Sequence, residues 1–385
     1  MNPNFGLAPF LILAQGIIAL ILLIEVYRRF SGGRRIAAWS AVVGFELVLG
    51  VTYLTTFTNR YGVPGGSGIR SRLAVAAIVY LLTSACVLVV YLVVWPFRKH
   101  MNGATDPSRR RALSLAGNAL LCSPVAAISY GSLIQRTDFE VREIDLPTPG
   151  LPAALDGLRL LQISDIHLSP FLSEKELAHV IDATLGLHPH LAFITGDLIS
   201  SARDPLEACI RQLARIKADA GVFGCMGNHE RFAGAENTTS RMGARLGMRF
   251  LRSQAAALRF GDSVLNVAGV DYESFSHRNH YLRGAERLVA PGAFNLLLSH
   301  NPDVFPFAAR QGYDLVLAGH THGGQVNIEI LEQSINPARF HTPYVYGLYR
   351  QGRSVEYVTR GVGTIGVPVR LGAPPEVALL RLRKT

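Results

Sequence analysis

Residues 159–167 read RLLQISDIH and determine the fold of the larger part of the chain. An apolar, strand-forming run at 159–164 leads directly into Asp165 and His167, as expected for a buried strand that ends in polar side chains. The same arrangement recurs four times downstream. The later apolar runs, each followed by glycine or by polar residues, are 191–195, 222–226, 293–299 and 313–318.

Helical patterns lie between the first of these runs. Residues 173–185 show helical periodicity, and Ser173 and Glu176 have the spacing of a capping box. A second helical pattern covers residues 204–220. Strands that alternate with helices predict an α/β sandwich, in which the polar residues at the carboxyl ends of neighbouring strands meet at one edge.

The positive charge of the chain is unevenly distributed. Of 385 residues, 49% are hydrophobic and only 17% charged, which excludes a disordered basic tail and a mostly polar soluble protein. Residues 1–135 hold twelve Lys and Arg against three acids, a net of +9 out of the chain's +10. Residues 136–385 hold 26 against 25, a net of +1. This distribution argues against nucleic acid as a partner and for membrane topology.

Four apolar segments make up most of the amino-terminal third. They cover approximately residues 7–27, 36–57, 73–95 and 112–134. Each has about the ~20 residues that a helix needs to cross a ~30 Å hydrocarbon core. Buried helices of a soluble protein are the alternative, but four such runs separated by short basic loops argue against it. We predict a membrane domain at 1–135 with four transmembrane helices, and a second domain at 136–385.

The loop charges predict an orientation. The first and third loops, at 28–35 and 98–111, carry nine Lys and Arg, whereas the second loop, at 60–72, carries three. Because cytoplasmic loops are enriched in Lys and Arg, the first and third loops should be cytoplasmic and the second domain extracytoplasmic. Should the fourth segment not cross, the second domain would be cytoplasmic instead.

Glu46 lies near the middle of the second apolar segment. An ionisable group at that depth is costly, so a functional role is one interpretation. The other is a protonated or hydrogen-bonded carboxyl that faces a neighbouring helix.

The polar residues that follow the strands have the chemistry of metal ligands. They are carboxylate, amide or imidazole donors without a thiolate, a set that suits Mn²⁺, Fe or Zn²⁺. Alternation at i and i+2 would direct both side chains of Asp-x-His and of His-x-His to the same side of an extended segment. The blocks hold too many ligands for one ion and enough for two: Asp165-Ile166-His167, Gly196-Asp197, Gly227-Asn228-His229-Glu230, His300 and Gly319-His320-Thr321-His322-Gly323.

In this order, the blocks closely resemble the calcineurin-like metallophosphoesterase family over roughly residues 158–375. The stretches 321–325 (THGGQ) and 360–376 resemble its membrane-associated bacterial subgroup with amino-terminal transmembrane helices. The resemblance implies a sandwich of two β-sheets flanked by helices. It also implies a hydrolase of phosphoric ester or phosphoanhydride bonds.

The resemblance further implies a role for each residue. A first metal ion would be bound by Asp165, His167 and His322. A second would be bound by Asn228, His300 and His320. Asp197 would bridge the two ions, and a hydroxide between them would attack phosphorus. His229 would protonate the leaving group, with a neutral histidine behind the ligands as the alternative, and Glu230 would orient His229.

We therefore expect a membrane-anchored phosphodiesterase or pyrophosphohydrolase with two divalent ions, Mn²⁺ first and Fe or Zn²⁺ as alternatives. The expected location is a bacterial cytoplasmic membrane, crossed several times. The expected partners are the lipid bilayer and a phosphoester substrate such as a phospholipid or a lipid-linked sugar phosphate. The alternative function is a membrane sensor or transport subunit that uses the metal domain for regulation. The polar loop at 272–287 is either a flap over the substrate or an ordinary solvated loop.

Overall fold

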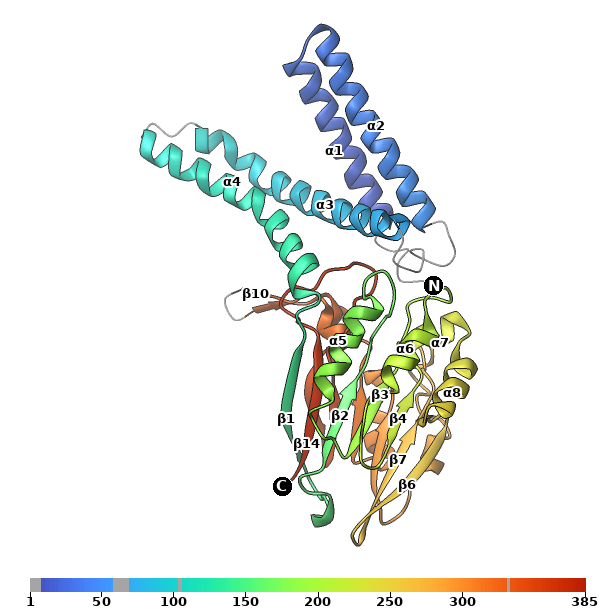
Figure 1. The fold of residues 1–385 in the computed structure, drawn as a ribbon. Coiled ribbons are helices and arrows are strands. Elements are labelled where there is room, and N and C mark those ends of the chain that lie inside the picture. The colour runs from blue at the N-terminus through green and yellow to red at the C-terminus, as the bar shows by residue number, and fades with distance from the viewer. Residues whose placement is uncertain (1–7, 58–68, 103–105, 331–332) are drawn as a thin grey trace. The chain divides into compact units, whose positions relative to one another are not determined.

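The structure, a computed structural model, describes residues 8–57, 69–102, 106–330 and 333–385. It consists of two compact units (Figure 1). One comprises residues 1–134 together with 366–368, and the other comprises residues 135–365 and 369–385. Each unit is described on its own below.

The described part of the first unit contains four helices. They are α1 (Ala8–Arg29), α2 (Gly32–Phe57), α3 (Ile69–Asn102) and α4 (Pro107–Tyr130), the last continued by a π-helical turn, Gly131–Gln135. Three helical stretches are long and apolar enough to cross a membrane: Gly32–Thr52, Leu73–Pro96 and Pro107–Gln135. The chain is therefore compatible with three membrane spans.

Of the four predicted spans, three are among these candidates. α1 is not among those found in the described residues, so the count of four is not confirmed. The leader 1–7 and Arg60 of the second loop lie outside the described residues.

Glu46 in α2 faces the neighbouring helix α1. The side-chain amide of Gln15, which is 6% exposed, donates a hydrogen bond to Glu46 Oε1 over 2.7 Å. Small and aliphatic side chains of three helices surround this level, namely Ala14, Leu49, Ala77, Leu81, Ala85 and Leu88. The structure thus shows a carboxyl that is hydrogen-bonded to a neighbouring helix, and a functional role of Glu46 stays a prediction.

The second unit is built on two six-stranded mixed sheets. The first sheet has the order β1 (Glu140–Thr148), β14 (Glu376–Lys384), β2 (Arg159–Ile163), β3 (Leu191–Thr195), β4 (Val222–Cys225) and β5 (Met248–Phe250). The second has the order β12 (Gly347–Gln351), β13 (Ser354–Val358), β9 (Leu315–Ala318), β8 (Phe294–Leu298), β7 (Ser263–Gly269) and β6 (Gln254–Phe260). A hairpin of β10 (Ile328–Ile330) and β11 (Gln333–Ile335) is separate.

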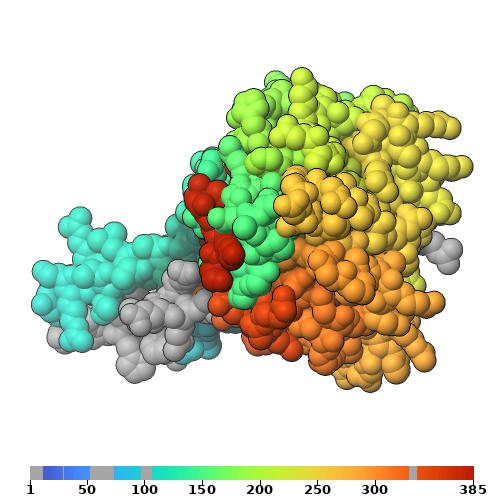
Figure 2. All heavy atoms as spheres, turned by 90° about the horizontal axis from the view of Figure 1, so that it is seen from below, coloured from blue at the N-terminus to red at the C-terminus, as the bar shows by residue number. Residues whose placement is uncertain are grey.

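The last strand of the chain completes the first sheet. β14 runs parallel to β1 and antiparallel to β2, so the carboxy-terminal strand lies between two early ones. In Figure 2 the red carboxy-terminal residues accordingly lie beside green residues, and the green-to-yellow and orange parts of the chain form two layers. β2, β3 and β4 are mutually parallel, and so are β7, β8 and β9.

The core lies between and outside the two sheets, as predicted for a sandwich flanked by helices. Side chains such as Phe193 and Leu296 fill the space between the sheets. The outer face of the first sheet is covered by α5 (Glu174–Thr184), α6 (Leu206–Leu213) and α8 (Glu236–Arg245), whereas α7 (Asn228–Ala233) follows the carboxyl end of β4 (Figure 1). The second sheet packs against α9 (Phe305–Gln311).

The helix predicted at 173–185 is confirmed at its start, whereas the helix predicted at 204–220 is shorter than expected. α5 begins at the predicted capping box of Ser173 and Glu176. The helix predicted at 204–220 is shorter, since α6 ends at Leu213. The reason is tertiary, because Ala220 N donates to His190 O and so holds the following residues in a turn beside β3.

Candidate metal centre

The predicted polar residues lie at the carboxyl ends of five strands. Asp165 and His167 follow β2, Asp197 follows β3, and Asn228 and His229 follow β4. In the second sheet, His300 follows β8, whereas His320 and His322 follow β9. All of these residues are buried except His320, which is intermediate. The chain thus collects its candidate ligands at the edge where parallel strands end, as expected for an α/β fold.

The backbone at these positions is left-handed rather than extended. The φ angle is +52° at Asp165, +48° at His167, +56° at Asp197, +76° at His320 and +53° at His322. Non-glycine residues adopt such angles at a cost of about 1–3 kcal/mol each, and they concentrate at functional sites. The argument from extended i, i+2 alternation is therefore wrong. Tight turns after the strands place these side chains, and they send His320 and His322 to different groups.

A first group consists of Asp165, His167 and His322, whose ligand atoms all lie within 4.8 Å of one another. His322 Nε2 is 3.1 Å from His167 Nε2 and 3.4 Å from Asp165 Oδ1. Two imidazole nitrogens and a carboxylate oxygen thus converge on one point.

A second group consists of Asp197, His300 and His320. His300 Nε2 is 3.2 Å from His320 Nδ1 and 3.1 Å from Asp197 Oδ2. The same Asp197 oxygen is 3.4 Å from His167 Nε2 of the first group. Asp197 therefore lies between the two groups and belongs to both.

Hydrogen bonds on the outer nitrogens orient the imidazoles. His300 Nδ1 is 2.7 Å from Thr195 O, and His322 Nδ1 is 3.3 Å from Gly363 O. Because a carbonyl oxygen can only accept, His300 carries a proton on Nδ1 and turns Nε2 toward its group. His322 Nδ1 also lies 3.3 Å from Arg370 Nη2, and its Nε2 points to the first group. His167 Nδ1 is 3.1 Å from Ser200 Oγ, which allows a proton on Nδ1 as in His300.

The electrostatics of the two groups favour a bound cation. Burial and the neighbouring His229 hold the pKa of His167 well below its usual value, and burial lowers that of His320 to about 3. These rings are thus neutral, the form that binds metals. The pKa of His300 is raised to about 10 although burial opposes this, because Asp197 and Asp165 attract its proton. The two buried carboxylates therefore stabilise positive charge at this point.

His229 lies beside the first group on α7. Its backbone N–H donates to Asp197 Oδ1 over 2.8 Å, and its Nδ1 is 2.7 Å from Ser200 O. Its ring centroid is 4.7 Å from that of His167. With the proton of Nδ1 donated to a carbonyl, Nε2 is the nitrogen that can exchange a proton with a substrate.

Comparisons with known proteins bear on what this constellation does. Residues 158–324, which contain every residue of both groups, match the family model for calcineurin-like phosphoesterases. The chain therefore carries a calcineurin-like phosphoesterase domain. Members of the family hydrolyse phosphoesters, and the chain is a hydrolase of this class.

Several relatives share the phosphoesterase domain. An uncharacterized metallophosphoesterase of Bacillus subtilis is 27% identical over 72% of this chain and 98% of its own length. A transmembrane protein with metallophosphoesterase domain from Danio rerio is 29% identical over 69% of this chain and 62% of its own length. A metallophosphoesterase of Campylobacter jejuni is 29% identical over 63% of each chain. Together with the three candidate spans, the transmembrane relative indicates a membrane protein.

The phosphoesterase domain implies divalent metal ions, and the residues present fit them. Asn228 is 5% exposed, and its amide oxygen has no hydrogen-bond partner among the described residues. A buried acceptor left unpaired costs about 1–3 kcal/mol unless an absent group occupies it. The mixed carboxylate, amide and imidazole set is one that divalent first-row metals accept.

Three further residues support the phosphoesterase site, and one of them, Glu230, differs from its predicted role of orienting His229. Glu230 accepts hydrogen bonds from the backbone of Asp197, Leu198 and Gly227, so it holds the Asp197 turn and has no bond to the His229 ring among those described. Ser200 O orients His229 instead, and no sequence signal pointed to it. Gln325 pairs with both backbone groups of Ile365, over 3.0 and 2.8 Å.

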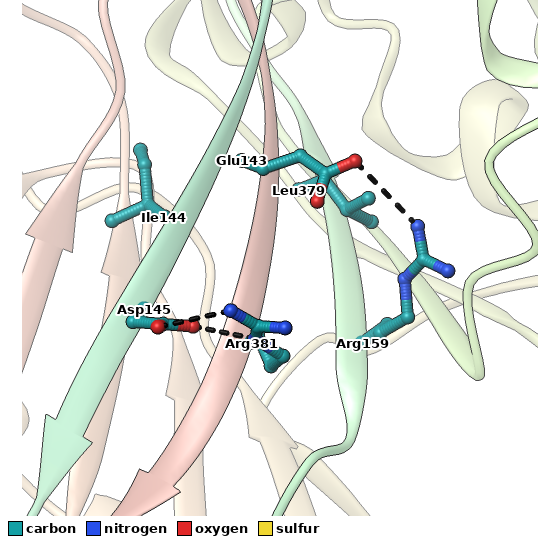
Figure 3. A pocket seen from close by; sticks show the side chains of 6 residues that line it. All are labelled: Glu143, Ile144, Asp145, Arg159, Leu379 and Arg381. Atoms are coloured by element: carbon teal, nitrogen blue, oxygen red, sulfur yellow. Dashed lines mark hydrogen bonds and ion pairs between the residues drawn. The ribbon is translucent and has the colours of Figure 1, made fainter.

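A pocket elsewhere in the domain offers no comparable chemistry. It has a volume of about 330 Å³ and is lined by Glu143, Ile144, Asp145, Arg159, Leu379 and Arg381 (Figure 3). Its charges are paired with one another, Asp145 with Arg381 at 2.5 Å and Glu143 with Arg159 at 3.8 Å. The amide oxygen of Asn228 without a described partner and the convergent imidazoles lie at the metal centre instead.

Proposed function

We propose that the chain is a membrane-anchored, dinuclear metal-dependent phosphoesterase that acts as a phosphodiesterase or pyrophosphohydrolase. In this proposal Asp165, His167 and His322 bind the first ion. Asn228, His300 and His320 bind the second, and Asp197 bridges the two. Mn²⁺ is the proposed metal, with Fe or Zn²⁺ as alternatives.

One observation carries the dinuclear proposal. Asp197 Oδ2 lies 3.4 Å from an imidazole nitrogen of the first group and 3.1 Å from one of the second. A carboxylate so placed can bind two cations at once. A pair of cations held by these residues would supply charge that neutralises phosphate oxygens and activates an attacking water.

The protein's own residues would then control the proton. His229 holds its Nδ1 proton against Ser200 O, which leaves Nε2 to protonate the leaving oxygen. The backbone bond from His229 to Asp197 fixes the proton donor relative to the bridging carboxylate. Phe232, whose ring lies 5.6 Å from that of His229, is 62% exposed, so the leaving group would meet an apolar side chain.

The substrate class is the second part of the proposal. We expect a phosphodiester or pyrophosphate with an apolar or lipid-linked group, such as a phospholipid or a lipid-linked sugar phosphate. The exposed Phe232 beside His229 and the apolar helices of the first unit support this class.

The experiment is activity profiling of the full chain, purified in detergent and loaded with Mn²⁺. A chromogenic phosphodiester, a phosphomonoester, a sugar nucleotide and a lipid-linked pyrophosphate are compared at equal concentration. We expect hydrolysis of diester or pyrophosphate bonds that is lost on chelation and restored by Mn²⁺. Preference for the monoester would contradict the proposed bond type. Inactivity of the metal-loaded chain on all four substrates would contradict the proposed phosphoesterase activity.

We further propose that the chain lies in a bacterial cytoplasmic membrane with its phosphoesterase domain outside the cytoplasm. The basic loops at 28–35 and 98–111 support this orientation. With the third loop inside, the side of the domain depends on whether α4 crosses, and not on whether α1 does. The stretch Pro107–Gln135 is among the candidate spans.

Reporter fusions test this topology. A reporter enzyme that is active only outside the cytoplasm, fused after Thr385, should be active, and a fluorescent protein that folds only in the cytoplasm should be dark there. The same pair fused after Asn102, in the third loop, should give the opposite result and serves as the control. A dark enzyme and a bright fluorescent protein at Thr385 would place the domain in the cytoplasm.

A further inference from the structure

Arg370 is a fully buried arginine that forms no ion pair with a carboxylate of the described residues. It lies between β13 and β14 and has 0% exposure. Among the described residues, no carboxylate lies within 4.0 Å of its guanidinium. The group donates to backbone carbonyls: Nε to Gly363 O (3.0 Å), Nη1 to His322 O (2.9 Å), Arg360 O (2.9 Å) and Ala373 O (3.2 Å), and Nη2 to Gly361 O (3.2 Å) and Gly363 O. Nη2 also lies 3.3 Å from His322 Nδ1.

Such an arrangement is costly. Burying a charge without a counter-ion is unfavourable, and carbonyl dipoles only partly replace the lost water. Burial lowers the pKa of Arg370 to about 9, which still leaves the group charged at neutral pH. A smaller neutral side chain would avoid this cost. The role of Arg370 should therefore lie in the backbone carbonyls to which its guanidinium donates.

One of those carbonyls lies beside the His322 ring. Gly363 O lies 3.3 Å from His322 Nδ1 and also accepts from Arg370. Arg370 Nη2 lies 3.3 Å from the same Nδ1, and Arg370 Nη1 donates to the carbonyl oxygen of His322. The guanidinium thus holds both the backbone and the ring of His322, and with them the direction of Nε2 toward the first group.

The same loop supports Asp165. Val362 N donates to Ser164 O over 3.0 Å, and Gly363 N donates to Asp165 O over 2.7 Å. The contact is so close that a Cβ added at Gly361 would lie 2.5 Å from Asp165 Cβ. Because the loop rests directly on Asp165, a displaced loop would move this carboxylate together with His322.

From these contacts we propose that Arg370 is a positioning residue for the first metal ion, holding Asp165 and His322 in their binding geometry. The inference rests on the proposed metal assignment. The second site takes its ligands from Asn228, His300 and His320, to which the guanidinium has no hydrogen bond among the described residues. Loss of Arg370 should therefore weaken the first site selectively.

Metal binding to the full-length protein in detergent tests this inference, with Mn²⁺ alone as the probe. Wild type should bind two ions and show the electron paramagnetic resonance signal of a coupled pair. Arg370→Met should bind the first ion roughly 10–100-fold more weakly, the usual effect of losing a group that orients a ligand. At Mn²⁺ concentrations that saturate wild type, its spectrum should be that of an isolated ion.

Arg370→Lys and Asn295→Ala complete the test. Lysine keeps the charge but is too short and has too few donors to bond all of these carbonyls. Arg370→Lys should therefore lose less affinity for the first ion than Arg370→Met does. If Arg370→Met does not fold, Arg370→Lys provides the test. Asn295 is the matched control, since it is buried and bonds the carbonyls of Ala290 and Ala293. Its loss should lower thermal stability and leave both affinities unchanged.

The outcomes separate the two proposals. A wild type that binds fewer than two ions contradicts the dinuclear proposal itself. A wild type with two ions, together with a folded Arg370 variant that binds both with wild-type affinity, overturns only the role of Arg370. Equal weakening of both sites would also overturn it, since a merely structural arginine would have that effect.

Discussion

Asp197→Asn should abolish hydrolysis while the chain still folds and inserts into the membrane. Asp197 is 2% exposed, and its Oδ2 faces both imidazole groups. Asparagine keeps the shape and the acceptor for the His229 N–H but removes the negative charge that two cations would share. Because such a pair supplies several kcal/mol of transition-state stabilisation, we expect a loss of at least ~10³-fold in kcat/KM.

The measurement is Mn²⁺-dependent hydrolysis of a chromogenic phosphodiester, made beside a metal count on the same sample. Asp314→Asn is the matched control: Asp314 is also buried, but it precedes β9 and so lies at the end of that strand opposite His320. It should keep full activity and two ions. If Asp197→Asn kept both its ions and its activity, Asp197 would not be the bridging ligand and the dinuclear proposal would be wrong.

The position of the site at the carboxyl ends of the strands could be predicted from the sequence, because apolar runs and the polar residues that follow them are local features. Asp165 directly follows a run of apolar residues, and His320 follows another, so their meeting at one edge needs only the parallel order of the strands. The division of His320 and His322 between two groups was not readable from spacing. It depends on left-handed turns that tertiary contacts impose.

The supporting residues could not be predicted for a related reason. Ser200 acts through its carbonyl oxygen, and every residue has one. Arg370 lies 48 positions after His322 and meets it only because the loop at 360–363 folds back over Asp165. In the membrane domain, hydropathy located the four helices of the described residues, because a long apolar run is a local feature of the sequence.

His229→Gln should lower kcat by ~10²–10⁴-fold for substrates with a basic leaving group, as expected when a general acid is lost. Glutamine can keep a side-chain hydrogen bond to Ser200 O but cannot donate a proton to a leaving alkoxide. His229 is not a ligand in the proposed assignment, so both Mn²⁺ ions should remain bound. The metal count and the signal of the coupled pair should equal those of wild type.

The choice of leaving group separates the two roles considered for His229. An alkyl phosphodiester needs a proton on its departing oxygen, whereas a p-nitrophenyl ester leaves as a stable anion and needs little help. If His229 is the acid, His229→Gln should lose far more activity on the alkyl ester than on the p-nitrophenyl ester. If it only supports the ligands from behind, both esters should lose activity by the same factor, because a disturbed metal centre slows every substrate alike. Equal losses would thus assign the proton to another group, and a leaving-group-dependent loss with two ions in place would assign it to His229.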